Sequence, residues 1–498
     1  MALAMGVSAA PAFAERINQE GRILGPAPVV TNSILFNTPE ADDIVSAMQI
    51  FPVTHPWNED ISRRPLLPNS EAMITQIVTD LSASRRTLRV FFEMNFALAP
   101  DTQPLVPINL FNYPDESDPS PYPIPPNLPI ETWPKETGGL TLGQWQQDIN
   151  DVGGDRHAII VQPGTGFVWE TWLTKLNPAG QWEASNGAKF DLKTNTLRQS
   201  GWTSADAAGL AMFPALVRFD ECRRGMVEHA VRLVVKRTRR EYIYPATHFA
   251  STTSATQTNV PAMGQRLRLK AGFVIPDLWT KEEKAVLKAL KKYGAMVADN
   301  GNFFSISATP DDRWPPGVFD HLSTVGITNF EVIQITGPNE GPRSPGAPTA
   351  DAGPDQTVPW GAPISLAGSV SFTGAPPMVR WKVYSGAGDV TFGDATRSNT
   401  TVIFTAPGAY VLELITADGV HAVAYDAVNV TVTPGIRAGI TRSGTNASLA
   451  WTGGIPPFVV EQTPELFAVA WNPVLTTAVR QATLPMKERA DFFRVRQP

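Results

Sequence analysis

The chain has 498 residues, and its 47 acidic side chains against 41 lysines and arginines give a formal net charge of −6 at pH 7. This length predicts about two to four domains, and the charge argues against a nucleic acid or an anionic membrane as partner. A single cysteine, Cys222, excludes an intrachain disulfide and a cysteine-rich zinc site.

The first residues of the chain, 1–14, are predicted to be a signal peptide. Their apolar run ends in Ala12-Phe13-Ala14, a small-residue cleavage pattern, and charged Glu15 follows. An ordinary apolar tail is the alternative. No other stretch reaches the roughly 18 consecutive apolar residues of a membrane span. We therefore expect a soluble monomer that is secreted or held at the cell surface.

Residues 22–334 are predicted to form a mainly β domain of the β-sandwich or jelly-roll-like type, with few helices. Runs of apolar and β-branched residues predict its strands, which we place at 105–110, 157–161, 167–172, 229–235 and 266–270. One helix is expected over 281–293. Thr280 and Glu283 have the spacing of a capping box, and Gly294 follows as a stop signal.

The same domain resembles a family of secreted bacterial and fungal proteins for which no activity is established. The resemblance is carried by FPVTHPWNEDIS (51–62), YPDESDPSPYPIP (113–125), GGDRHAIIV (153–161), WEASNGAKFDL (182–192), GWTSADAAGL (201–210), LVRFDE (216–221), HAVRL (229–233), YIYPATHFAS (242–251), MGQRLRLKA (263–271) and YGAMVADNG (293–301). It implies a shared fold and no reaction. One departure is LRVFFEMNFA (88–97), where the resemblance implies a His-Pro-Asp-Phe-Gly-like loop.

A glycine- and proline-rich segment, residues 335–346, is expected to be a linker. Residues 347–434 resemble a PKD-type immunoglobulin-like domain through AGPDQTV (352–358), ISLAGSVS (364–371), VRWKVYSGAGDVTF (379–392), NTTVIFTAPGAYVLELITADG (399–419) and VNVTV (428–432). The resemblance implies a β-sandwich with Trp381 buried between its sheets. Residues 435–498, with SLAWTGGIPPFVVEQ, resemble the small C-terminal β-domains of exported bacterial proteins.

Acidic and imidazole side chains near strands of the 22–334 domain are the candidates for acid–base catalysis. They are Asp155 and His157 in GGDRHAIIV, Glu170 between two tryptophans, Asp206 in GWTSADAAGL and His248 in YPATHFAS. We expect Asp206 or Glu170 to act as acid or base, and His157 or His248 to carry the proton. A second interpretation of Asp206 stays open, in which Thr203 caps a short helix and Asp206 only satisfies its first turn.

Cationic and aromatic side chains are the candidates for substrate binding. An arginine that faces a cleft suits an acidic sugar, and a tryptophan face stacks on sugar rings. The candidates are Arg156, Arg218, Arg266, Trp172 and Trp202. A solvated arginine and a tryptophan buried in the core are the alternatives. No cofactor is expected, although His157, His229 and His248 form an alternative metal-ligand set without short ligand spacing.

The chain contains none of the motifs GxSxG, GxxxxGK[ST], GxGxxG at a strand–helix joint or HExxH, which disfavours serine hydrolases, P-loop and dinucleotide-dependent enzymes, and zincins. Appended β-modules are typical of exported enzymes that act on polymers, an argument by analogy. We therefore expect a polysaccharide-active enzyme, either a glycoside hydrolase or a polysaccharide lyase, with a polysaccharide or cell-surface glycan as partner. A non-catalytic glycan-binding adhesion protein and a histidine-ligated metal enzyme are the alternatives.

Overall fold

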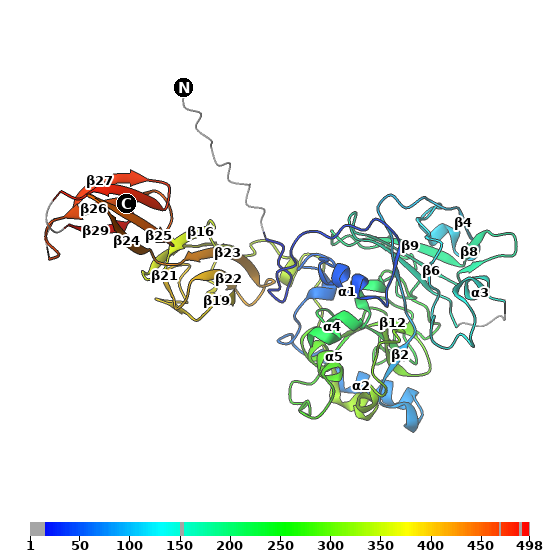
Figure 1. Ribbon diagram of the computed structural model, residues 1–498. Coiled ribbons are helices and arrows are strands. Elements are labelled where there is room, and N and C mark those ends of the chain that lie inside the picture. The colour runs from blue at the N-terminus through cyan, green and yellow to red at the C-terminus, as the bar shows by residue number, and fades with distance from the viewer. Residues whose placement is uncertain (1–14, 150–153, 468–469, 488–490, 498) are drawn as a thin grey trace. The chain divides into compact units, whose positions relative to one another are not determined.

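The computed structural model describes residues 15–149, 154–467, 470–487 and 491–497 (Figure 1). The predicted signal peptide, residues 1–14, lies outside this description. The chain divides into two compact units. The larger unit contains residues 16–345 and 420–422, and the other contains the chain up to residue 15, residues 346–419 and the chain from residue 423 onward.

A six-stranded mixed sheet forms the centre of the larger unit. Its strands in spatial order are β14 (Phe330–Val332), β11 (Arg266–Leu269), β12 (Ala295–Asn300), β10 (Val231–Val235), β13 (Phe304–Ala308) and β2 (Leu88–Phe92). The β10–β12 and β13–β2 pairs are parallel, and the other three pairs are antiparallel. The order leaves β2 as an edge strand of this sheet.

The larger unit also contains helices, some of which pack against this sheet. They are α1 (Pro39–Ser46), α2 (Ser70–Asp80), α3 (Leu142–Gln147), α4 (Phe219–Arg224) and α5 (Lys281–Lys292). Helix α5 contacts α4 (Figure 1) and also β11, and α2 contacts β14. Leu290 of α5 and Leu233 of β10 are fully buried in one continuous core. Because side chains alternate along a strand, Arg232 points to the face of β10 opposite to Leu233.

The longest helix forms where the sequence predicts it. The Thr280 hydroxyl accepts a hydrogen bond from the Glu283 backbone N–H at 3.0 Å, and the Glu283 carboxylate accepts one from the Thr280 N–H at 3.0 Å. These two bonds are the predicted capping box. The helix ends at Lys292, and Gly294 follows with a positive φ of 69°, a backbone conformation that favours glycine. The prediction of a helix in this segment is confirmed.

Two smaller sheets complete the larger unit. The five-stranded sheet contains β1 (Ile34–Leu35), β3 (Ala97–Leu98), β5 (Ala158–Gln162), β6 (Phe167–Trp172) and β9 (Asn186–Asp191), and the three-stranded sheet contains β4 (Ile108–Leu110), β8 (Trp182–Ala184) and β7 (Lys175–Leu176). A connecting segment bridges the two larger sheets. Its Ala208 N–H donates to the carbonyl of Ala298 in β12 at 2.9 Å, and its Met212 N–H donates to Glu170 in β6.

The prediction of a mainly β chain with β-sandwich domains is confirmed, and the predicted strands of the larger unit are present within a few residues. The pairing in this unit differs from the antiparallel pairing of a jelly roll, since β10–β12, β13–β2 and β3–β5 are parallel. Parallel neighbours require long crossover connections. The segment between β10 and β12, which contains β11 and α5, is one such connection.

The segment predicted as a linker, 335–346, belongs to the larger unit as far as Pro345. Arg343 donates to the carboxylate of Glu59 at 2.9 Å, and the Thr336 hydroxyl donates to the same carboxylate at 3.0 Å. The side chains of Arg343 and Glu59 are only 3% and 4% exposed. A buried ion pair therefore anchors the end of this segment to the unit.

A β-sandwich follows in residues 347–434. One sheet contains β16 (Gln356–Pro359), β23 (Ala424–Thr433), β22 (Gly408–Ala417) and β19 (Met378–Gly386); the other strands are β17 (Ile364–Ala367), β21 (Asn399–Phe404) and β20 (Val390–Phe392), with the pair β15 (Thr349–Asp351) and β18 (Ser369–Ser371). Trp381 is 2% exposed and belongs to the core together with Leu366 and Leu414. The predicted burial of Trp381 is confirmed.

The last part of the chain forms two three-stranded sheets. They contain β24 (Arg437–Ser443), β25 (Asn446–Thr452) and β28 (Gln481–Pro485), and β27 (Asn472–Thr477), β26 (Phe458–Thr463) and β29 (Phe492–Arg496). Trp451 and Phe458 meet edge to face in their small core, with ring centroids 5.5 Å apart. No helix in the described ranges of the chain combines the length and the apolarity that a bilayer crossing requires.

Candidate functional site

The centre of the candidate site is Arg232, a buried arginine in β10. Its Nε and Nη2 donate to the two oxygens of Asp206 at 2.8 and 2.9 Å, and Nη2 also donates to Asp299 Oδ2 at 3.0 Å. Its Nη1 donates to the Ser307 hydroxyl at 3.1 Å and lies 3.8 Å from Glu93 Oε1. Burial opposes the charge of Arg232, but the carboxylates of Asp206 and Asp299 raise its pKa above the ordinary value.

The register of the six-stranded sheet explains this convergence. In β13, Ser305 pairs with Val234 of β10, so that Ser307 lies opposite Arg232 in the antiparallel ladder. Glu93 follows the last residue of β2, and its N–H donates to the carbonyl of Ala308. Side chains two residues apart along a strand share a face. Glu93, directly after β2, therefore lies on the same face of the sheet as Ser307 and Arg232. The Ser307 hydroxyl donates to Glu93 Oε1 at 2.5 Å.

Two carboxylates of this cluster are partly exposed. The side chains of Glu93 and Asp299 are 23% and 26% exposed, whereas those of Arg232 and Asp206 are 3% and 1% exposed. Burial raises the pKa of Glu93 to about 7, against the charge of Arg232. Burial also raises the pKa of Asp299 to about 6, again against the charge of Arg232. Both groups therefore titrate close to neutral pH, as acid–base catalysts do.

A buried ion pair of His157 and Glu131 stands beside this cluster. His157 Nδ1 lies 2.9 Å from Glu131 Oε2, and His157 Nε2 lies 3.1 Å from the carbonyl oxygen of Ala205. Burial opposes the charge of His157, but Glu131 raises its pKa to about 9. The imidazole is therefore protonated at neutral pH, and both ring N–H groups donate. The backbone N–H of Thr132 donates to the carbonyl of Glu93 at 2.8 Å, which places this pair next to Glu93.

Three neighbouring residues of one segment connect the predicted candidates His157, Asp206 and His248. The carbonyl of Ala205 accepts from His157, the carboxylate of Asp206 binds the guanidinium described above, and the carbonyl of Ala207 accepts from His248 Nδ1 at 2.8 Å. Residues 201–210 form turns and no helix. The interpretation of Asp206 as a helix cap is therefore wrong: its carboxylate neutralises a buried arginine.

Glu170, the other predicted acid or base, lies deeper than this segment. It is fully buried, and its carboxylate accepts hydrogen bonds at 2.9 to 3.0 Å from the backbone N–H groups of Met212 and Phe213. Burial raises the pKa of Glu170 to about 7, while these two bonds lower it. The side chain holds the 204–212 segment against β6 and does not reach solvent.

Asp155, Trp172 and Trp202 lie outside this cluster. Asp155 is exposed next to the buried His157. Trp172 is partly buried, with its ring centroid 6.3 Å from that of Tyr113. Trp202 is also partly buried, and the guanidinium of Arg198 lies 5.5 Å from its ring centroid.

The predicted binding arginines Arg156 and Arg218 are both tied to protein groups. Arg156 is 4% exposed and donates to the carbonyls of Thr174 at 3.0 Å and Trp145 at 2.7 Å. Arg218 is 3% exposed and forms an ion pair with Glu221 at 2.7 Å. Neither guanidinium belongs to the cluster around Arg232.

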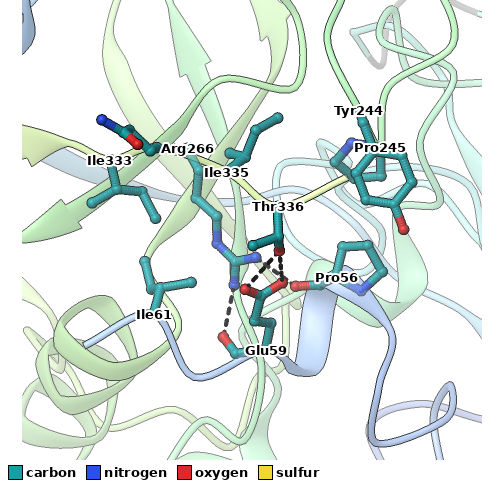
Figure 2. Close-up of a pocket in the computed structure, with 10 residues that line it drawn as sticks. Pro56, Glu59, Ile61, Tyr244, Pro245, Arg266, Ile333, Ile335 and Thr336 are labelled. Atoms are coloured by element: carbon teal, nitrogen blue, oxygen red, sulfur yellow. Dashed lines mark hydrogen bonds between the residues drawn. The ribbon is translucent and has the colours of Figure 1, made fainter. Parts of the chain in front are cut away.

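Arg266 lines a small pocket, which Figure 2 shows together with Pro56, Glu59 and Thr336. The guanidinium is 3% exposed and donates to the backbone carbonyls of Pro56 at 2.6 Å, Glu59 at 3.1 Å and Tyr293 at 2.6 Å. Burial lowers the pKa of Arg266 to about 10. The open volume of about 10 Å³ holds no more than one water molecule. Arg266 joins the 56–59 turn to β11.

The three histidines of the alternative metal set are not brought together. His229 lies with Nε2 3.1 Å from Glu221 Oε2 and Nδ1 2.7 Å from the carbonyl oxygen of Ala230. His157 and His248 have the separate partners given above. Within the described part of the chain, no group of three or more His, Cys, Asp or Glu side chains is arranged to hold a metal ion.

Glu93 and Glu131 were not among the residues that the sequence singled out. Glu93 lies in LRVFFEMNFA, the stretch that departs from the resembled family, and Glu131 lies in a proline-rich loop. Among the residues of the cluster, Arg232 has a position in the sequence that indicates the site. A charged residue in the middle of the apolar strand HAVRLVV is expected to bury its guanidinium, and a buried guanidinium needs hydrogen-bond acceptors, among which a carboxylate also balances its charge.

Comparison with known proteins defines one part of the chain. Residues 352–432 match a family model described as a PKD domain, and this segment is a PKD-type immunoglobulin-like domain. Among solved structures, the PKD domain from the KIAA 1837 protein is 28% identical, with 19% of this chain and 93% of that chain covered and a TM-score of 0.17. The PKD domain of human KIAA0319 is 18% identical, with coverages of 19% and 88% and a TM-score of 0.16. No curated protein matches the chain.

The His157–Glu131 pair predicts a pH-dependent stability. The pKa of His157 in the folded protein, about 9, lies above its ordinary value of 6.5. The stabilisation is therefore complete below about pH 6.5 and lost as the pH rises through 9. We expect His157→Gln to lower the free energy of unfolding by about 3 kcal/mol near pH 6 and by much less at pH 9.5. Urea unfolding at both pH values measures this, and a difference that is independent of pH contradicts it.

Proposed function

We propose that the larger unit is an exported polysaccharide-active enzyme of the glycoside hydrolase type, with Glu93 and Asp299 as its acid–base pair. The observation that supports the proposal is the pair of partly exposed carboxylates, with pKa values of about 7 and about 6, on the two sides of Arg232. Export is supported by the cleavage pattern that ends at Ala14 and by the appended PKD-type domain.

The two pKa values give each carboxylate a role. Glycoside hydrolysis requires one protonated carboxylic acid, which protonates the leaving oxygen, and one carboxylate, which activates water or attacks the sugar. Burial raises the pKa of both carboxyl groups towards neutral pH, to about 7 for Glu93 and about 6 for Asp299, and we assign the acid to the group with the higher value. Glu93 is therefore the general acid and Asp299 the base or nucleophile. Arg232 and Asp206 are positioning residues that hold the pair in place.

The charges of the cluster favour hydrolysis over lyase chemistry. A lyase requires a base, together with a cation that neutralises the carboxylate of the sugar. His157 is protonated at neutral pH and cannot accept a proton. The charge of Arg232 is already matched by Asp206 and Asp299. This satisfied arginine also supports the second candidate function, a non-catalytic glycan-binding adhesion protein in which the cluster only stabilises the fold.

Product release over a panel of neutral and acidic polysaccharides tests the proposal. We expect new reducing ends without unsaturated uronates. The rate is expected to rise with the ionisation of Asp299 near pH 6 and to fall with the ionisation of Glu93 near pH 7, which gives a maximum between these values. Glycan binding without product across the panel supports the adhesion protein instead. Unsaturated products indicate a lyase, and a stoichiometric metal in the purified protein supports the metal enzyme.

A further inference from the structure

A partly exposed aromatic side chain lies beside the acid–base pair. Phe91 of β2 pairs in register with Ser307 of β13, and the Ser307 hydroxyl donates to Glu93. Residues paired across neighbouring strands point to the same face of a sheet, as do residues two apart along one strand. Phe91 therefore lies on the face of Glu93, about 6.6 Å from it along the strand. Because β2 is an edge strand, a neighbouring strand lies on only one side of Phe91.

The ring of Phe303 fixes the orientation of Phe91. The two ring centroids are 5.2 Å apart and the ring planes meet at 76°, which is an edge-to-face contact. Such a contact covers at most one face of the Phe91 ring, and both residues are partly exposed. A partly exposed aromatic ring next to Glu93 is suited to stacking on the ring of a bound sugar.

Arg89 is the next side chain of β2 on this face. It pairs with Ser305 of β13, which pairs in turn with Val234 of β10, two residues after Arg232. This row of residues therefore crosses the sheet on the face that carries the acid–base pair. Arg89 is partly exposed, and it donates to the backbone carbonyl of Ser84 at 3.2 Å.

Two further cations adjoin Phe303. The Arg85 guanidinium lies 4.5 Å from the ring centroid of Phe303 and donates to the backbone carbonyl of Asn302 at 3.3 Å. The Lys236 ammonium donates to the side-chain carbonyl of the same asparagine. The acceptors of Arg85, Arg89 and Lys236 are neutral, and in the described part of the chain none of the three cations forms an ion pair. This part of the sheet face therefore carries positive charge that the protein does not balance.

We propose that this basic surface, formed by Arg85, Arg89, Phe91 and Lys236, binds the sugar next to the cleaved bond, and that the substrate is an acidic polysaccharide. The inference rests on the proposed hydrolysis and names its substrate class. Phe91 stacks on the sugar ring, and Arg89 binds the carboxylate or sulfate of that sugar, because a guanidinium matches the two oxygens of such a group. Arg85 and Lys236 add to the positive field that attracts the polymer.

The position of Arg89 is compatible with hydrolysis. Arg89 precedes Glu93 by four residues, about 13 Å along an extended strand. A lyase requires its cation at the carboxylate of the sugar that reacts. At this distance Arg89 reaches the adjacent sugar instead, and it selects an acidic polymer without contacting the reacting sugar. Arg89 and Phe91 are therefore specificity-determining residues.

Binding of defined hexasaccharides to the full chain tests this inference. The chain carries Glu93→Gln, so that no probe is cleaved. The acidic probes are hexagalacturonate and hexamannuronate for carboxylates and a κ-carrageenan hexasaccharide for sulfates. Each has a neutral counterpart with the same rings, either methyl-esterified or desulfated, and calorimetry measures every Kd. We expect at least one acidic probe to bind about tenfold more tightly than its neutral counterpart, or better.

Substitutions on the basic surface assign the binding to it. Arg89→Gln and Phe91→Ala are each expected to raise the Kd of the acidic probe about tenfold, whereas Phe91→Tyr keeps the ring and the Kd. The matched controls are Arg63→Gln and Phe111→Ala, which remove an exposed cation and an exposed ring elsewhere in the larger unit and leave the Kd unchanged. Arg89→Gln changes a partly exposed side chain, so it tests the inference even if Phe91→Ala does not fold.

This inference and the proposed hydrolysis fail in different ways. The inference is overturned if no acidic probe binds, if the neutral counterparts bind as tightly, or if Arg89→Gln and Arg63→Gln have the same Kd. Release of product by the wild-type chain from neutral polysaccharides alone also overturns it and leaves the hydrolase in place. Binding of an acidic probe through Arg89 without product from any polysaccharide overturns the hydrolysis instead, and only the binding of an acidic glycan is then retained.

Discussion

Replacement of Arg232 by methionine is expected to lower the free energy of unfolding of the larger unit by about 3 to 5 kcal/mol. Methionine has a similar length, so the core stays filled, but Asp206 and Asp299 lose the cation that balances them. The side chain of Asp206 is 1% exposed, and water cannot replace the guanidinium. Burial raises the pKa of Asp299 to about 6, and protonation removes one of the unbalanced charges, so the loss is expected to be smaller at pH 5 than at pH 8.

Urea unfolding of the full chain at the two pH values measures this effect, with the transition of residues 346–497 as an internal reference. The control is Arg237→Met. Arg237 pairs with Asp80 at 2.7 Å but is 36% exposed, so a loss of at most about 1 kcal/mol is expected. Adding Asp206→Asn and Asp299→Asn to Arg232→Met is expected to recover part of the stability. A loss below about 1 kcal/mol in Arg232→Met contradicts the conclusion that this ion pair contributes strongly to the stability of the larger unit.

Replacement of Glu93 by glutamine is expected to lower kcat by about a hundredfold to ten-thousandfold on any polysaccharide that the enzyme cleaves. Glutamine keeps an acceptor oxygen for the Ser307 hydroxyl, so the fold is retained. It has no proton to give to the leaving oxygen. The alkaline limb of the pH profile, which reports the ionisation of Glu93 near pH 7, is expected to disappear together with the activity.

The control for this substitution is Glu136→Gln. Glu136 is an exposed carboxylate in the turn that follows Glu131, and we expect an unchanged kcat. A substrate whose leaving group needs no protonation separates the roles further, because Glu93→Gln should then retain most of its first-step rate. If Glu93→Gln retains the wild-type kcat, Glu93 is not the general acid, even if the protein is a hydrolase.

Local signals carried much of the fold prediction. The capping box at Thr280 acts over a few residues and formed as the sequence predicts, and Trp381 is buried as the PKD resemblance implies. The parallel pairing of β10 with β12 could not be predicted from the sequence, because it depends on how the long segment between the two strands packs. Sequence periodicity records which face of a strand is apolar, but not which strand becomes its neighbour.

For the same reason, only part of the candidate site was predicted from the sequence. Asp206 was singled out, but its partner Arg232 is 26 residues away, and Asp299 lies 67 residues beyond Arg232. Glu93 follows an apolar strand without any motif. The register of the sheet brings Glu93, Arg232 and Asp299 together and the connecting segment adds Asp206, and a single sequence does not encode either arrangement in short spacings. The tryptophans and arginines were chosen as candidates by residue type alone. Residue type does not distinguish a side chain that is buried in the fold from one that is exposed and able to contact a substrate.

The buried pair of Arg343 and Glu59 has a mechanical consequence. A protein whose last domains hold an insoluble material is pulled along its chain whenever that material moves. A force applied from residue 346 onward meets the hydrogen bonds of Ser344 to the Gly341 carbonyl and then the pair of Arg343 with the Glu59 carboxylate, which Thr336 also binds. The load then passes into the 56–59 turn and β11 through Arg266. Strand β11 lies next to the β14 edge of the six-stranded sheet and Glu93 follows β2 at the opposite edge, so we expect such a load to leave the geometry of Glu93 unchanged.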